Sequence, residues 1–249
     1  MSNGDDNWFE NQLDQIYAGL FDPTSGYYLA NIIQNGYDDP GAGIKIAPWT
    51  SAPLPDVNNV SAGRPLPGAC GLDFEHGAAA FTGLNNVATN FGSVGPVSGM
   101  GLLFSDNDFV VQVPFSFSTI LINGDLILIQ PCTGGSGNNY NNTYTGTFEA
   151  TANNPILFAT VTLSLGPPVT GTVHPISLSF PSPATAFVFT GQVNDAPDNM
   201  ETFWNNLANS PQIIQQVTSA LQAGIAGPAA EQWIESIVNM VLAQVPTKG

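Results

Sequence analysis

Residues 106–130 read DNDFVVQVPFSFSTILINGDLILIQ, and this stretch decides the fold more than any other part of the chain. From Phe109 to Phe117 the odd-numbered residues are Phe, Val, Val, Phe and Phe, with Gln112, Pro114 and Ser116 between them. A period of two is typical of a half-buried strand. Beyond Ser118 both faces of the chain become apolar. The stretch therefore supplies more hydrophobic strand surface than one small sheet needs.

The neighbouring segments predict how this strand is paired. Asn123-Gly124 favours a tight turn, which predicts a hairpin between Ile120–Ile122 and Leu126–Gln130. Upstream, Met100–Phe104 is expected to pair with Phe109–Phe117 across a turn at residues 105–108. Downstream, Cys132–Asn142 is polar and rich in glycine, and it is predicted to be a flexible loop.

Further strands are predicted on both sides of this region, separated by Pro, Gly and Asn punctuation. In 161–165 and 176–180 every second residue is Ser or Thr, so one face of each strand is polar and faces solvent while the other is apolar and buried. The pattern predicts a long antiparallel sheet. The predicted strands are Phe81–Val87, Tyr144–Ala150, Ile156–Leu165, Val173–Phe180 and Phe187–Val193.

Helical spacing of apolar residues occurs at the two ends of the chain. From Trp8 to Leu20 apolar residues recur every three or four positions, which predicts an amphipathic helix. A second stripe runs from Ile213 to Val245 and is interrupted at 224–228 by glycine and proline. These patterns predict an α+β fold in which a short N-terminal helix precedes a long sheet and a long, kinked C-terminal helix follows it.

Charge excludes several classes of function. The chain has three basic residues against nineteen acidic ones, a net charge of −16. Nucleic acid is excluded as a partner because binding phosphates requires clustered Lys and Arg, and an anionic membrane surface is disfavoured for the same reason. No apolar run reaches the length of about 18 residues that a stable membrane anchor needs. The first residues lack the pattern of a signal peptide. The protein is expected to be extracellular or periplasmic with its signal removed, or else cytoplasmic.

Two cysteines and two histidines are the residues of this chain that could form a metal site. Cys70, Cys132, His76 and His174 could in principle bind zinc, but they lack the close paired spacing of a structural zinc site. The two cysteines are therefore expected to form a disulfide. Residues 106–108 lack the glycine and distal glutamate of a calcium loop. There is no Gly-x-Ser-x-Gly elbow and no phosphate-binding glycine loop. The sequence is therefore expected to be neither an enzyme nor a metal or cofactor protein.

Two segments carry a resemblance to a known superfamily. Thr82-Gly83-Leu84-Asn85-Asn86-Val87 looks like a Gly-Leu-x-Asn-Val strand, and Val113-Pro114-Phe115 to Gly124-Asp125-Leu126 looks like a Val-Pro-x-Leu to Gly-x-Tyr hairpin. With the flanking helices, they resemble the tubular lipid-binding (TULIP) superfamily, in particular its single-module takeout and juvenile-hormone-binding members. The chain departs from that pattern in the position of its cysteines, which usually lie near the N-terminus, and in a Pro-rich segment at 35–67 without a counterpart.

The resemblance implies a single lipid-binding domain over 1–249, with a loop insertion at 34–68, an antiparallel sheet at 80–193 and a C-terminal helix at 210–245. In that fold a strongly curved sheet wraps the helix and encloses an apolar tube. The implied function is a secreted carrier of a lipid or similar apolar small molecule, with a protein partner left open. The implied wall residues are Phe115, Phe117, Ile120, Ile122, Leu126, Leu128, Phe187, Phe189, Ile213, Val217, Leu221 and Trp233. The alternatives are an extracellular β-rich interaction module, adhesin-like or a toxin component, and a pore-forming β protein.

Overall fold

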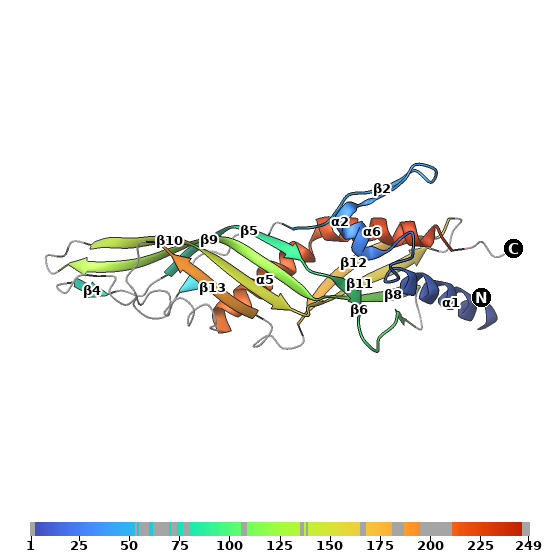
Figure 1. Ribbon diagram of the computed structural model, residues 1–249. Helices are drawn as coiled ribbons and strands as arrows, with labels where there is room; N and C mark the ends of the chain where they lie inside the picture. Colours follow the sequence, from blue (N-terminus) through green and yellow to red (C-terminus); the bar gives the residue numbers. More distant parts are fainter. Residues whose placement is uncertain are drawn as a thin grey trace.

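A computed structural model describes residues 3–52, 54, 60–61, 70, 74–76, 80–105, 109–134, 137, 139–164, 168–180, 187–194 and 211–245. The molecule is elongated, with antiparallel strands along its length, and α1, α2 and α6 lie toward the same end (Figure 1). The α+β class predicted from the sequence is confirmed.

The helices within the described residues are α1 (Asn3–Gly19), α2 (Leu29–Asn35), α5 (Pro211–Ile225) and α6 (Pro228–Leu242). The strands are β1 (Tyr37–Asp39), β2 (Ile44–Ile46), β3 (Val60–Ser61), β4 (Phe74–His76), β5 (Ala80–Phe91), β6 (Val94–Pro96), β7 (Leu103–Phe104), β8 (Val110–Phe117), β9 (Thr119–Gly134), β10 (Asn139–Asn153), β11 (Ile156–Ser164), β12 (Thr170–Ser179) and β13 (Phe187–Val193).

The strands form a small hairpin and two larger antiparallel sheets. In the six-stranded sheet the order is β13-β10-β9-β5-β3, with β4 also on β9. In the five-stranded sheet the order is β12-β11-β8-β6, with β7 also on β8. The predicted pairing of Met100–Phe104 with Phe109–Phe117 is confirmed by β7 and β8. The hairpin of β1 and β2 lies inside the segment that was predicted to be a loop insertion.

The two large sheets are connected by strands that keep their register through a corner. Ser116 of β8 is paired with Ile156 of β11, and Thr119 of β9 is paired with Asn153 of β10. The second pair lies three residues further along one strand and three residues back along the other, so both pairs belong to one antiparallel ladder. At the corner the amide of Asn154, a residue with φ of 50°, donates to the carbonyl oxygen of Ser118 at 3.0 Å. The pair β5 and β6 follows β9 and β8 around the same corner.

The buried side of this ladder changes at the corner. In β8 and β11 the buried residues are odd-numbered, except for Pro114, whereas in β9 and β10 they are even-numbered. Strands that turn a corner pass from one packed face to another by a local irregularity. Each sheet therefore presents its own apolar face to the core, although the same strands build both.

Two predictions about β9 were wrong. Asn123-Gly124 does not form a hairpin turn, because β9 continues through it, with Asn123 opposite Glu149 and Gly124 opposite the buried Phe148. Asn123 and Asp125 are exposed on the outer face, where polar residues fit a strand as well as a turn. Cys132–Asn142 is also not a loop throughout, since β9 runs to Gly134 and β10 begins at Asn139.

The C-terminal helical stripe is divided into α5 and α6, as the glycine and proline between them predicted. At Gly227 a Cβ atom would lie 2.5 Å from the carbonyl oxygen of Ala223, so only glycine fits this turn. Pro228 then occupies the first turn of α6, where its missing amide hydrogen costs nothing. The break allows α5 and α6 to run in different directions along the sheets.

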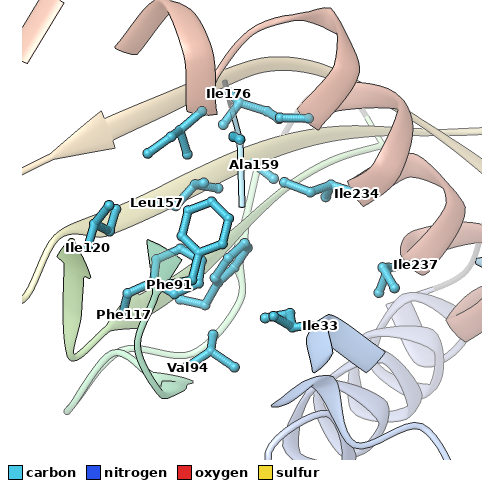
Figure 2. Packing of buried hydrophobic residues seen from close by; sticks show 14 of the residues in the cluster. Ile33, Phe91, Val94, Phe117, Ile120, Leu157, Ala159, Ile176, Ile234 and Ile237 are labelled. Atoms are coloured by element: carbon cyan, nitrogen blue, oxygen red, sulfur yellow. The ribbon is translucent and has the colours of Figure 1, made fainter. Parts of the chain in front are cut away.

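The hydrophobic core lies between α6, α2 and the corner of the ladder (Figure 2). Phe117 and Ile120 stand on either side of the corner, and both are fully buried. Ile234 and Ile237 project from α6, and Ile33 from α2. Helices and both sheets therefore contribute to one continuous core.

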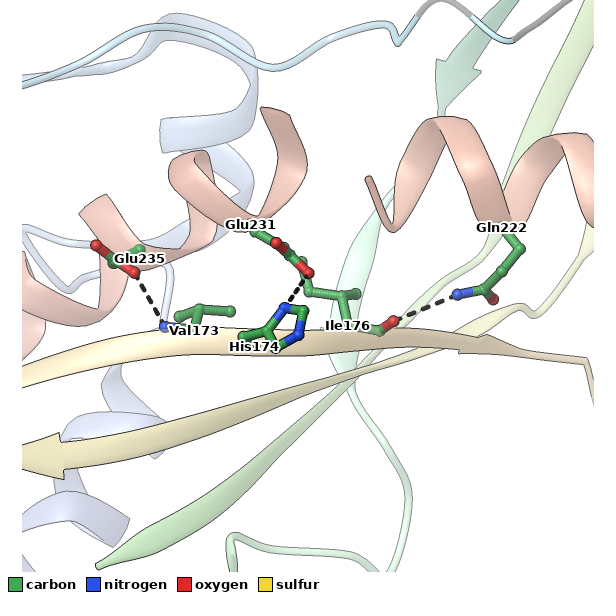
Figure 3. A network of polar contacts seen from close by, with 6 residues as sticks. All are labelled: Val173, His174, Ile176, Gln222, Glu231 and Glu235. Atoms are coloured by element: carbon green, nitrogen blue, oxygen red, sulfur yellow. Dashed lines mark hydrogen bonds and ion pairs between the residues drawn. The ribbon is translucent and has the colours of Figure 1, made fainter. Parts of the chain in front are cut away.

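Polar side chains of α5 and α6 bind the backbone of the edge strand β12 (Figure 3). Glu235 accepts a hydrogen bond from the amide of Val173 at 3.0 Å, and Glu231 contacts the imidazole of His174 at 2.9 Å. Gln222 accepts from the amide of Leu178 at 2.8 Å. An edge strand otherwise exposes unpaired backbone groups, so these helices take the place of a neighbouring strand.

Within the described residues, the helices are too short or too polar to cross a lipid bilayer.

Candidate ligand cavity

An apolar cavity of about 70 Å³ lies between α1, α6 and the strands β8 and β11. Interiors of proteins are close-packed, with few voids larger than a water molecule. An empty space of this size beside the core is therefore a feature to explain. The lining residues are Leu13, Tyr17, Leu20, Phe21, Leu29, Leu102, Val111, Val113, Phe115, Val161, Leu163, Trp233, Ile234, Ile237, Val238, Val241 and Leu242.

The strand wall of the cavity is the odd-numbered row of β8. Val111 and Phe115 are buried and Val113 is half-buried, and all three line the cavity. The same row ends in the core at Phe117, and it begins outside β8 at Phe109, which is 52% exposed. The alternation that defined this strand in the sequence therefore runs from solvent, past the cavity, into the core.

The helical wall comes from the apolar stripes of α1 and α6. Leu13, Tyr17 and Leu20 follow one face of α1 at spacings of four and three, which places them in one stripe. From α6 the contributing residues include Ile234 and Val241, again on one face. The two stripes face the same cavity, to which β8 and β11 also contribute residues.

Two polar groups in the wall already have partners. The hydroxyl of Tyr17 donates to the carbonyl oxygen of Pro114 at 2.5 Å, and the indole N–H of Trp233 donates to the carbonyl oxygen of Ala47 at 2.7 Å. Burial raises the pKa of Tyr17 to about 12, and a backbone hydrogen bond at Val97 offsets part of the rise. Tyr17 is therefore a neutral hydroxyl at physiological pH.

The described lining residues of the cavity include no charged side chain. They include residues near the end of α1, such as Tyr17, and residues along α6 from Trp233 to Leu242. Neither helix has a basic residue in its last turn. The described part of the wall therefore offers no cation to an anionic ligand.

Aromatic rings connect the cavity wall to the corner of the ladder. Trp233 lies 4.9 Å from Trp49, which lies 4.6 Å from Phe91, and Phe91 is stacked on Phe117 at 5.1 Å between ring centroids. Phe115 meets Phe117 edge to face at 5.7 Å. Aromatic pairs of this geometry add to the energy of burial, so the inner end of the cavity is closed by a stable cluster.

The structure brings two of the residues predicted from the sequence to the cavity, Phe115 and Trp233. The others for which side chains are described are buried but do not line this cavity: Phe117, Ile120, Ile122, Leu126, Leu128, Val217 and Leu221 are all at most 2% exposed. The side chains of Phe187, Phe189 and Ile213 lie outside the described residues. Cys70 and Cys132 are joined in a disulfide, on the six-stranded sheet and away from the cavity.

The sequence did not predict the contribution of α1 to the site. The apolar stripe from Trp8 to Leu20 predicts an amphipathic helix, but it does not indicate a cavity beside that helix. The alternation of β11 at Val161 and Leu163 likewise predicts a strand and not a cavity. The available signal was that both stripes are apolar.

Two other depressions are open to solvent and more polar. One of about 360 Å³ lies along α2 between Pro23 and Asn35, and one of about 290 Å³ lies between β2 and α6 beside Lys45 and Glu235. Among the described residues, no three His, Cys, Asp or Glu side chains gather as metal ligands would.

Comparison with known proteins gives little beyond this geometry. No family model matches the sequence, and no match was found among curated proteins. The crystal structure of Epiphyas postvittana Takeout 1 is similar over 78% of this chain and 80% of that chain, with 13% sequence identity and a TM-score of 0.37. A similarity at this level does not indicate a function for this chain.

Proposed function

We propose that this protein is a non-catalytic carrier that encloses an apolar small molecule or lipid. The observation that carries the proposal is the apolar cavity of about 70 Å³ between α1, α6, β8 and β11. An engineered apolar cavity of about 150 Å³ stays dry and takes up benzene. A cavity lined by Leu, Val, Ile and Phe therefore favours hydrophobic molecules over water.

The cavity in this structure is smaller than the ligands expected. Small-molecule pockets usually enclose about 300–1,000 Å³, so an occupied form has to be wider than the form described here. We propose that the ladder of β8–β9 and β10–β11 curves around α5 and α6, and that the ligand occupies a widened form of the cavity between α1, α6, β8 and β11. Binding would be driven by removing apolar area from water, at about 25 cal/mol per Å² before association costs.

Two measurements on the purified protein test the proposal. Extraction with organic solvent followed by mass spectrometry should identify a bound apolar compound, or else the emptied protein should take up N-phenyl-1-naphthylamine saturably with an increase in fluorescence. An extract free of apolar compounds, together with no saturable uptake, would exclude the carrier function.

A further inference from the structure

The chemical class of the ligand follows from the polar groups that the cavity lacks, and this step rests on the proposed function. Any head group that enters the cavity loses its water shell. The two polar groups of the wall, on Tyr17 and Trp233, are already hydrogen-bonded to backbone carbonyl oxygens. The wall therefore offers no free donor that is ready for an anion.

Among the described residues, no Lys or Arg lines the cavity. The chain contains only Lys45, Arg64 and Lys248. Lys45 is exposed on β2, and the other two lie outside the described residues. The carboxylates of Glu231 and Glu235 are engaged with β12 on the outer side of α6. A fatty-acid ligand would bring its own carboxylate into this apolar wall without a partner. Burying an unpaired carboxylate is so costly that the group becomes protonated instead.

The field of the whole molecule acts in the same direction. The net charge of −16 lowers the concentration of anions near the surface. We infer that the cavity selects uncharged apolar ligands, such as esters, alcohols and hydrocarbons, and excludes fatty-acid anions and other anionic lipids.

A matched pair of ligands tests this selection. Methyl palmitate and palmitic acid have the same acyl chain, but only the acid has a head group that ionises, and each is measured by displacement of N-phenyl-1-naphthylamine from the native protein. An ordinary carboxyl group has a pKa of about 4.3, so binding only as the neutral acid weakens palmitate roughly 500-fold at pH 7. The affinity of the acid should rise about tenfold for each unit that the pH falls toward 5. The affinity of the ester should stay constant.

The outcomes separate this inference from the carrier function. Equal affinity of acid and ester at pH 7 overturns the inference and leaves the carrier function intact. An acid that binds more tightly than the ester overturns it too. If neither ligand nor the fluorescent probe binds, the carrier function fails and the inference fails with it.

A variant that adds a cation supplies a second test. Leu102 lines the cavity and is half-buried, whereas its neighbour Leu103 is 44% exposed and faces Gln112 on the outside. Leu102→Lys should raise the affinity for palmitate at pH 7 at least tenfold and leave the ester unaffected, while Leu103→Lys should change neither. An unchanged palmitate affinity in Leu102→Lys would show that a missing cation is not what excludes the acid.

Discussion

Filling the cavity from the strand side should stabilise the protein and stop ligand uptake. Val113 projects into the cavity from β8, and Val113→Phe replaces its side chain by a ring in a strand, where aromatic residues are well tolerated. At about 24 cal/mol per Å³ of cavity, the volume of about 70 Å³ corresponds to at most about 1.7 kcal/mol that complete filling would recover. The free energy of unfolding should therefore rise by up to that amount.

Urea denaturation measures the free energy of unfolding, and fluorescence of N-phenyl-1-naphthylamine measures uptake in the same preparation. Gln112→Phe is the matched control, because Gln112 is exposed on the opposite face of the strand, and it should leave uptake unchanged. Overpacking a core that has no space costs about 1–3 kcal/mol. A loss of stability of that size in Val113→Phe, with uptake as in the original protein, would refute the cavity.

The remaining predictions concern the contact between α6 and β12 and the buried tyrosine. Gly171→Ala places a methyl group 2.8 Å from Cγ1 of Val238, so it should lower the free energy of unfolding by about 1–3 kcal/mol in urea, whereas Gly101→Ala, with nothing within 4 Å, should not. Asn239→Ala removes the hydrogen bonds at 2.9 and 3.0 Å to the N–H and C=O of Gly171. Calorimetry should show that the free energy of unfolding falls by about 1–3 kcal/mol. An unchanged melting temperature would mean that water replaces the side chain. Because burial raises the pKa of Tyr17 to about 12 from 10.0, its contribution is complete below pH 10 and is lost as pH rises toward 12. Tyr17→Phe should flatten this alkaline loss in denaturation curves recorded from pH 9 upward, and an equally steep loss would assign it to another group.

The strands were predictable because their burial alternates with the sequence. Val110–Phe117 and Ile156–Ser164 were found nearly to the residue, since one face of each strand is buried and the other is not. The turn at Asn123-Gly124 was not, because the residues that favour a tight turn also fit the exposed face of a strand that has partners on both sides. Local sequence does not record that second neighbour.

The cavity was only partly predictable, for a different physical reason. Sequence identifies which residues are apolar, but an empty volume depends on how side chains from distant segments fit together. Phe115 and Trp233 were identified because they lie on strongly apolar faces, whereas Leu126 and Leu128 have the same pattern and are buried without lining this cavity. The role of α1 depends on contacts between Tyr17 and Pro114, which are 97 residues apart in the chain.

Methyl NMR spectra recorded during titration with methyl palmitate test the central claim most directly. Residues of the cavity wall, such as Leu13, Val111 and Leu242, should show saturable shifts, while Leu126 and Leu128, which are buried on the six-stranded sheet and do not line the cavity, should not. Saturable shifts at Leu126 and Leu128 without any at the cavity wall, or no saturable shifts at all, would contradict the account.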